Sequence, residues 1–209
     1  MEIRDKYFSE KTMFKRLKKV ATDENLSNLS RALDYAKEKH KNEFRKQSKF
    51  NKNIKIPYII HPLMMTCHAH ALGIKDDKVL TVCMLHDICE DCDILPEDLP
   101  FDEDIIISIK RLTKNDFAST KDYYAEIERD STAAIVKALD RVNNISTMSS
   151  AFTIEKEIEY IDETEKYVYP LFDKIKYDYE QYSDAIFVLK YHLVSLVETI
   201  KCLIEENKK

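Results

Sequence analysis

Charged and polar side chains interrupt three of the most apolar stretches of this sequence. His61 follows the apolar run YII, His86 and Asp87 stand within VLTVCMLHDICED, and Asp140 stands within AIVKALDRV. Burying such groups without partners costs a few kcal/mol, so their positions need a chemical reason. Two imidazoles and two carboxylates brought together could bind one divalent ion, and this mixture of ligands suits Mn, Fe or Zn.

Each of these residues also has an ordinary structural interpretation. A single buried histidine is usually a hydrogen-bonded core residue, and Asp140 could pair with Arg141 or cap a turn. The joint pattern of His, His-Asp and Asp on three separate predicted helices is far less expected by chance. The pattern as a whole therefore favours a shared metal site.

The elements that carry these residues are predicted to be helices. Apolar residues recur at helical spacing, and no convincing strand pattern, internal repeat or low-complexity linker is found. The helices are expected at about 25–47, 61–72, 79–91, 102–111, 120–129, 131–148, 153–178 and 183–206. The helix at 79–91 is apolar on nearly every side, so we expect it to be central and buried.

The scarcity of glycine narrows the fold class. The chain has 209 residues and one glycine, Gly73, which we expect to end the helix before it. Glycine-rich dinucleotide loops and P-loops are excluded, and hairpin-rich β folds are disfavoured. The sequence predicts a single all-α helical bundle, with an N-terminal helical extension (1–24), a main domain (25–178) and a C-terminal amphipathic helix packed on it (179–209).

Composition limits the partners. The net charge is −5, which argues against general nucleic-acid binding. No apolar run is long enough for a transmembrane helix, and no signal peptide is evident, so we expect a cytoplasmic protein with no membrane partner. Five cysteines are expected to be free thiols, and the lone C-x-x-C at 89–92 does not make a zinc ribbon. The oligomeric state is not set by the sequence, and we expect the stripe at 183–206 to cover the core.

The segments YIIHPLMM, LTVCMLHDICED and VKALDRVNNIST resemble the HD-domain metal-dependent phosphohydrolases. More narrowly, they resemble the hydrolase domain of RelA/SpoT-type enzymes and their small stand-alone relatives. Those enzymes remove the 3′-pyrophosphate from guanosine tetra- and pentaphosphate, (p)ppGpp. Further motifs carry the narrower resemblance across roughly residues 25–172: Arg-Lys at 45–46, Pro-Tyr-Ile-x-His-Pro at 57–62, Leu-His-Asp-x-x-Glu-Asp at 85–91, Leu-Thr-Lys at 112–114, Asp-Arg-x-x-Asn at 140–144 and YIDETEKYVYPL at 160–171.

The resemblance implies roles for the site residues. It makes His61, His86, Asp87 and Asp140 the metal ligands, and it implies one divalent metal, usually manganese. It also implies that Glu90 and Asp91 help to activate the attacking water. Helical spacing independently places each of these acids one turn after a ligand, at i+4, although a solvated helix end would show the same pattern.

The resemblance further implies a nucleotide pocket. Arg45 and Lys46 would border the base, and guanidinium stacking on a base is physically reasonable. Asn144, one helical turn after Asp140, would contact the nucleotide, and Thr147 would lie near the base or ribose. Candidates to balance phosphate charge are Lys114, Lys137 and Arg141, with exposed surface charge as the alternative interpretation. Tyr123 and Tyr124 could line the pocket, but core packing is the favoured interpretation.

These residues predict hydrolysis of (p)ppGpp to GDP or GTP and pyrophosphate, with a metal that lowers the pKa of water. Two departures from the family pattern stand out. The loop between Arg45 and His61 is longer and lacks the family's glycines, which bears on base specificity. Asn143 replaces a frequent histidine at a position that we expect to be less central. Alternatives are hydrolysis of an adenosine analogue or a nicotinamide dinucleotide phosphate, or a non-catalytic nucleotide-sensing module.

Overall fold

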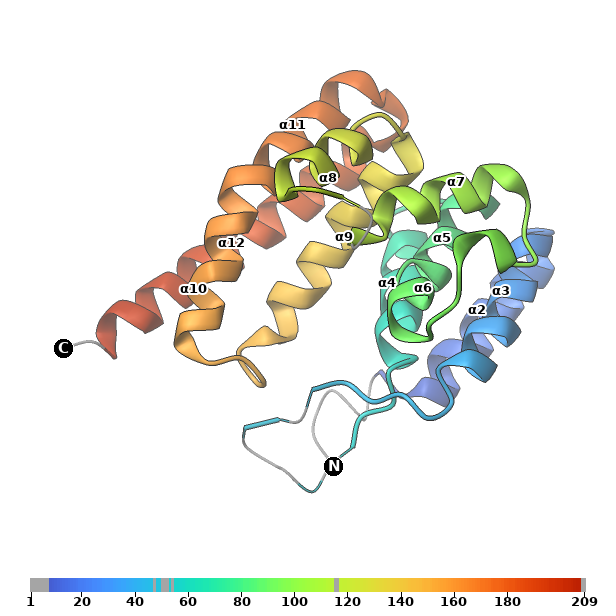
Figure 1. The fold of residues 1–209 in the computed structure, drawn as a ribbon, viewed down its shortest axis with the longest axis horizontal. Coiled ribbons are helices and arrows are strands. Elements are labelled where there is room, and N and C mark those ends of the chain that lie inside the picture. Colours follow the sequence, from blue (N-terminus) through green and yellow to red (C-terminus); the bar gives the residue numbers. More distant parts are fainter. Residues whose placement is uncertain (1–7, 47, 50–52, 54, 115–116, 208–209) are drawn as a thin grey trace.

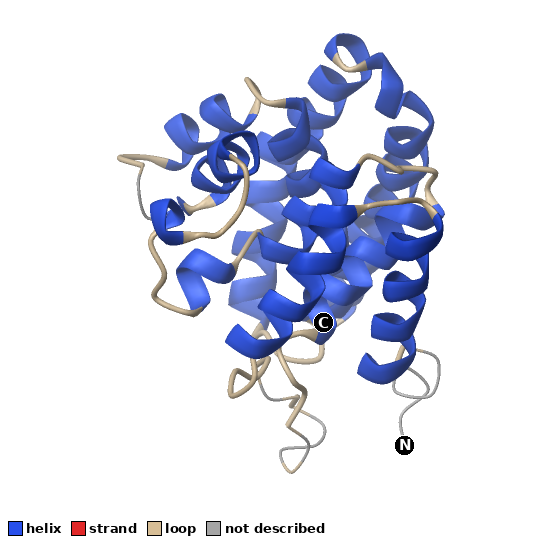
Figure 2. Cartoon of the chain, turned by 90° about the vertical axis from the view of Figure 1, so that its right-hand side faces the viewer, coloured by secondary structure: helices blue, strands red, loops and turns tan. Residues whose placement is uncertain are grey.

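A computed structural model describes residues 8–46, 48–49, 53, 55–114 and 117–207. Within these ranges the chain is helical, and its only pairing of extended backbone is an isolated antiparallel bridge between Phe44 and Pro57. Figure 2 shows helices joined by loops, with no strand in the part of the chain that is described. The predicted all-α class is therefore confirmed.

The longer helices are α2 (Glu10–Asp23), α3 (Ser27–Lys39), α4 (Ile60–Ala71), α5 (Asp77–Leu85), α7 (Glu103–Leu112), α8 (Thr120–Ile127), α9 (Ser131–Met148), α10 (Ile154–Glu163), α11 (Tyr169–Asp178) and α12 (Ser183–Glu206). Short helical segments are α6 (Ile88–Asp91), η1 (Pro96–Asp98), η3 (Thr164–Val168) and η4 (Glu180–Tyr182). Among the described residues, no helix is long and apolar enough to cross a membrane.

Helix α9 is the centre of the fold. It packs against α4, α5 and α7 on one side and against α11 and α12 on the other (Figure 1). Its start is fixed by Asp130, whose carboxylate accepts hydrogen bonds from the backbone N–H groups of Thr132 (2.8 Å) and Ala133 (3.1 Å). A helix enclosed on several sides buries any polar residue that it carries, and Asp140 and Asn143 are both buried on α9.

Helix α5 is apolar and buried over its whole length from Val79 to Leu85, as its composition predicts. Asp76 caps it by accepting a hydrogen bond from Val79 N at 3.1 Å. The neighbouring Asp77 accepts from the backbone N–H groups of Asn28 (2.9 Å) and Leu29 (2.8 Å), at the start of α3. Asp77 therefore joins the start of α3 to the start of α5, and these two helices pack side by side.

Two predicted helices differ from the expected continuous helix. The helix predicted at 25–47 ends at Lys39, because the following chain pairs with a later segment through Arg45 N to Ile56 O and Tyr58 N to Glu43 O, both 2.9 Å. The helix predicted at 153–178 contains a π-helical turn at 164–168. Pro170, just after it, has no N–H to donate to the preceding turn.

Both ends of the described chain contribute to the core. Helix α2 buries Met13, Leu17 and Ala21 and packs on α3 and α4. Helix α12 buries an apolar stripe that includes Leu189 and Leu193 and packs on α9 and α11. One continuous core includes residues from all three predicted segments, 1–24, 25–178 and 179–209. The division of the chain into these segments stays a prediction.

Candidate metal centre and adjoining cavity

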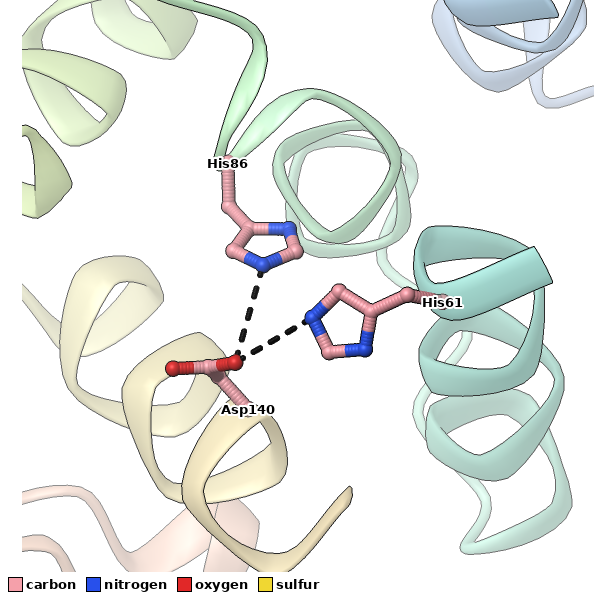
Figure 3. A group of neighbouring side chains, drawn as sticks. All are labelled: His61, His86 and Asp140. Carbon is pink, nitrogen blue, oxygen red and sulfur yellow. Dashed lines mark ion pairs between the residues drawn. The ribbon is translucent and has the colours of Figure 1, made fainter. Parts of the chain in front are cut away.

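Three of the four predicted ligands converge between helices α4, α5 and α9. The Oδ1 atom of Asp140 lies 3.3 Å from His61 Nε2 and 3.7 Å from His86 Nε2. One ligand atom from each residue lies within 4.8 Å of the others, and all three residues are buried. Figure 3 shows the two rings and the carboxylate pointing toward a common centre from three separate segments of the chain.

Asp87 lies beside this group. Its Oδ2 atom is 3.0 Å from His86 Nε2 and 3.6 Å from His61 Nε2. The same oxygen accepts a hydrogen bond of 2.5 Å from the hydroxyl of Tyr58. The structure therefore brings Asp87 close to both imidazoles and also gives it a protein partner.

The chain path at His86 and Asp87 differs from the single helix predicted at 79–91. Helix α5 ends at Leu85 and α6 begins at Ile88, so the two site residues occupy the junction. Adjacent side chains on a continuous helix point about 100° apart. The interrupted helix instead allows both side chains to reach the same centre.

The outer nitrogen of each imidazole has a hydrogen-bond acceptor. His61 Nδ1 lies 2.8 Å from Asn143 Oδ1, and His86 Nδ1 lies 3.0 Å from the backbone oxygen of Cys83. Both Nδ1 atoms therefore carry hydrogen. The Nε2 atoms are buried and make no hydrogen bond, despite the nearby carboxylates.

This donor set fits a divalent cation. Two imidazoles with protonated Nδ1 atoms can turn the lone pairs of their Nε2 atoms toward an ion, and one or two carboxylates can balance its charge. Buried Nε2 atoms without partners are otherwise costly. A metal such as manganese, iron or zinc would satisfy them.

Electrostatics in the centre follow from burial and close opposite charges. Burial lowers the pKa of His61. Burial also acts to lower the pKa of His86, but the charges of Asp87 and Asp140, which a bound cation would otherwise balance, outweigh it and raise that pKa. Although burial opposes ionisation of Asp140, Lys137 and the imidazoles hold the pKa of its carboxyl well below the usual range. Lys137 Nζ lies 3.0 Å from Asp140 Oδ2.

A cavity of about 390 Å³ opens beside His61, and four of the predicted nucleotide-binding residues, Arg45, Lys46, Asn144 and Thr147, line it. Its other walls are largely apolar or aromatic and include Phe152 and Tyr160. The volume lies within the usual range for small-molecule sites.

Asn144 connects this cavity to the metal centre. Its Nδ2 donates to Asp140 Oδ1 at 2.6 Å, and its Oδ1 accepts from Arg45 at 3.1 Å. The Arg45 guanidinium lies 5.7 Å from the centre of the Tyr58 ring, and Lys46 Nζ lies 5.0 Å from the centre of the Phe152 ring. Cations and aromatic faces are thus paired along the cavity wall.

The two predicted catalytic acids are placed differently. Asp91 lines the cavity, and desolvation together with the charge of Asp87 raises the pKa of its carboxyl to about 6. Glu90 instead accepts a hydrogen bond of 2.5 Å from the backbone N–H of Lys114. The structure therefore places Asp91, rather than Glu90, beside the space that a ligand would fill.

None of the three predicted phosphate contacts, Lys114, Lys137 and Arg141, lines the cavity. Arg141 is 1% exposed, and its guanidinium bonds to groups on α8 and α10 and at the start of η3, including Glu163. Lys114 Nζ lies 3.4 Å from Glu163 Oε2. The phosphate contact of Arg141 stays a prediction, and in this structure its donors are buried and engaged within the protein. Tyr123 and Tyr124 are buried core residues, as favoured from the sequence.

Two residues at the site were not predicted. Asn143, expected to be less central, contacts His61 directly, and Tyr58 contacts Asp87. A sequence signal existed for Asn143, because it interrupts the apolar pattern of α9, as Asp140 does one turn earlier. Tyr58 had no such signal, since a tyrosine before a helix is equally at home in a core.

Comparison with known proteins supports the resemblance to RelA/SpoT-type enzymes that the sequence motifs indicate. No protein-family model matches the chain. A guanosine-3′,5′-bis(diphosphate) 3′-pyrophosphohydrolase of Aquifex aeolicus is 28% identical over 87% of this chain and 26% of its own length. A probable enzyme of the same name from Synechocystis is 28% identical over 70% of this chain and 20% of its own length. A probable GTP pyrophosphokinase of Mycobacterium leprae is 27% identical over 78% of this chain and 22% of its own length.

The matched region spans about a quarter or less of each of these relatives. In each case it covers most of the present chain. The resemblance inferred from the motifs is therefore confirmed: over most of its length, this chain is similar to curated (p)ppGpp 3′-pyrophosphohydrolases.

Proposed function

We propose that this protein is an HD-type phosphohydrolase that removes the 3′-pyrophosphate of (p)ppGpp, leaving GDP or GTP. The observation that carries the proposal is the convergence of His61, His86 and Asp140 beside a nucleotide-sized cavity. The names of two relatives support the choice of substrate, and the motifs at 57–62, 85–91 and 140–144 support the reaction type.

His61, His86 and Asp140 would hold the ion, with Asp87 as a fourth ligand adjacent to both imidazoles. When bound, a divalent metal such as Mn²⁺ supplies Lewis acidity that lowers the pKa of water and neutralises charge on phosphoryl oxygens. Lys137 adds a positive charge next to the Oδ2 atom of Asp140.

The remaining steps fall to residues of the cavity wall. Arg45 and Lys46 would border the base, and Asn144 and Thr147 would orient the nucleoside relative to the centre. Asp91, which lines the cavity, would accept a proton from the attacking water. The water oxygen bonds to the phosphorus that is attached to the 3′ oxygen, and the bond between this phosphorus and the 3′ oxygen breaks. The 3′ oxygen takes a proton, and pyrophosphate departs.

The test is an assay of pyrophosphate release with Mn²⁺ and a panel of nucleotides. The panel holds guanosine tetraphosphate, an adenosine analogue and nicotinamide dinucleotide phosphate. We expect turnover of guanosine tetraphosphate that Asp87→Ala abolishes. Asp184→Asn, which changes an exposed carboxylate on α12, is the matched control and should keep full activity.

The possible outcomes separate the alternatives. Turnover of a different panel member, with the same loss in Asp87→Ala, would support an HD phosphohydrolase of other specificity and reject (p)ppGpp as the substrate. Bound manganese with no turnover of any nucleotide would reject the hydrolase and favour a non-catalytic module. Absence of binding of both Mn²⁺ and Zn²⁺ by calorimetry would reject the metal centre itself.

A further inference from the structure

We propose that Asn143 is a positioning residue that holds the His61 imidazole in the one tautomer able to bind a metal. The inference deepens the proposed function and rests on it, since His61 is taken as a ligand. It concerns a side chain at which this sequence departs from its family's frequent histidine. The residue stands on α9, three positions after Asp140, and is 7% exposed.

The geometry of the contact is direct. Asn143 Oδ1 lies 2.8 Å from Nδ1 of His61, which is itself 2% exposed. An amide oxygen only accepts hydrogen bonds, so the imidazole nitrogen facing it must be the donor. In a neutral imidazole, a proton on Nδ1 leaves the lone pair on Nε2, and that atom faces Asp140 and His86.

Without Asn143 the proton has a competing position. Asp140 Oδ1 lies 3.3 Å and Asp87 Oδ2 lies 3.6 Å from His61 Nε2, and both carboxylates can accept a hydrogen bond. A buried imidazole that lost its acceptor at Nδ1 would move its proton to Nε2. The lone pair needed for a metal would then be occupied, and Nδ1 would face an apolar gap.

His86 also needs a hydrogen-bond acceptor for its Nδ1 atom, and the backbone supplies it. Its Nδ1 donates to the backbone oxygen of Cys83 at 3.0 Å, a contact that no side-chain substitution removes directly. His61, at the second residue of α4, instead relies on a side chain from a different helix. Asn143 is therefore the point at which the tautomer of a candidate ligand can be changed by mutation.

Nuclear magnetic resonance of the imidazole nitrogens tests the tautomer without any metal. The chain has 6 histidines, so long-range ¹H–¹⁵N spectra remain simple, and His61→Gln identifies the signal of His61. We expect His61 to be protonated on Nδ1 in the metal-free protein at pH 7.5. Asn143→Leu should shift the proton to Nε2, whereas Asn143→Asp, which keeps an acceptor, should retain it on Nδ1.

Calorimetry with Mn²⁺ tests the consequence. Loss of such an outer partner typically weakens metal affinity by about 10–100-fold, and we expect this loss in Asn143→Leu. Asn143→Asp should bind within a few-fold of the wild type or more tightly, because it adds negative charge near the imidazole. Ser146→Ala, an exposed change on the same helix, should bind as the wild type does. Should Asn143→Leu fail to fold, Asn143→Ala removes the same acceptor with less bulk.

Two results would overturn the proposal: wild-type manganese affinity in a folded Asn143→Leu or Asn143→Ala variant, or a wild-type His61 whose proton lies on Nε2. A different result identifies failure of the underlying function instead. If the wild type carries its proton on Nδ1 but binds neither Mn²⁺ nor Zn²⁺, the proposed metal centre is wrong and the assigned tautomer still stands.

Discussion

The burial of Arg141 allows a direct test of whether this predicted site residue stabilises the fold or contacts the nucleotide. Its guanidinium is enclosed by α8, α10 and the start of η3. It donates to Tyr160 O (3.2 Å), Thr164 Oγ1 (3.3 Å), Tyr124 Oη (2.9 Å) and Glu163 Oε1 (2.5 Å). The substitution Arg141→Met keeps most of the side-chain length and removes every one of these donors.

The expected cost follows from the partners left behind. Breaking a buried ion pair by removing one member costs about 3–5 kcal/mol. The lower end applies here, because the Glu163 side chain is 25% exposed and Lys114 Nζ remains 3.4 Å from it. We therefore expect Arg141→Met to lower the free energy of unfolding by about 3 kcal/mol. At about 2–4 °C per kcal/mol for a chain of this size, Tm should fall by about 6–12 °C.

The assay is urea unfolding of the metal-free protein, followed by nucleotide affinity measured below the unfolding transition. Glu163→Gln removes the partner's charge, and the double variant should cost less than the sum of the two single variants, because the two side chains interact directly. Nucleotide affinity of folded Arg141→Met should stay close to that of the wild type. A variant with wild-type stability and strongly weakened nucleotide binding would refute the structural role and restore Arg141 as a phosphate contact.

Two further predictions concern single residues of the scaffold. Gly73 has φ of +86°, and a Cβ added there meets no heavy atom within 4 Å, so Gly73→Ala should cost only the backbone penalty of about 1–2 kcal/mol in urea unfolding. A decrease of more than about 3 kcal/mol in the free energy of unfolding would show that a steric clash of the added Cβ, and not the backbone conformation, requires glycine at this position. Cys202 is exposed, whereas Cys83 is buried and burial raises the pKa of its thiol. Mass spectrometry should therefore find Cys202 alkylated long before Cys83 in the native protein, and equal rates would contradict the burial of α5.

Much of the fold follows from local pattern. The apolar periodicity of 131–148 and 183–206 predicts α9 and α12 with the bounds that the structure shows. These helices are long, and each repeats its apolar residues over several turns, so the pattern is strong. Gly73 after α4 is likewise a local signal, because a positive φ favours glycine whatever the surroundings.

The breaks between helices depend on distant contacts and were predicted poorly. Nothing near Lys39 indicates that α3 ends there, since the cause is pairing of residues 43–45 with 56–58. The junction at His86 and Asp87 lies inside an apolar run that is typical of one helix. In both places, tertiary contacts outweigh helix propensity, which is a weak local preference.

The sequence by itself determined the all-α class and the identity of the four candidate ligands, because buried polar residues within apolar helices are visible as interruptions of a pattern. Only the tertiary structure decided which atoms face the centre and which cations are free for a ligand. His61 and Asn143 are 82 positions apart in sequence, yet their contact fixes the tautomer. Arg45 reaches the cavity while Arg141 is buried. Both outcomes depend on how helices pack, and residue type alone carries no information about a partner supplied by another helix.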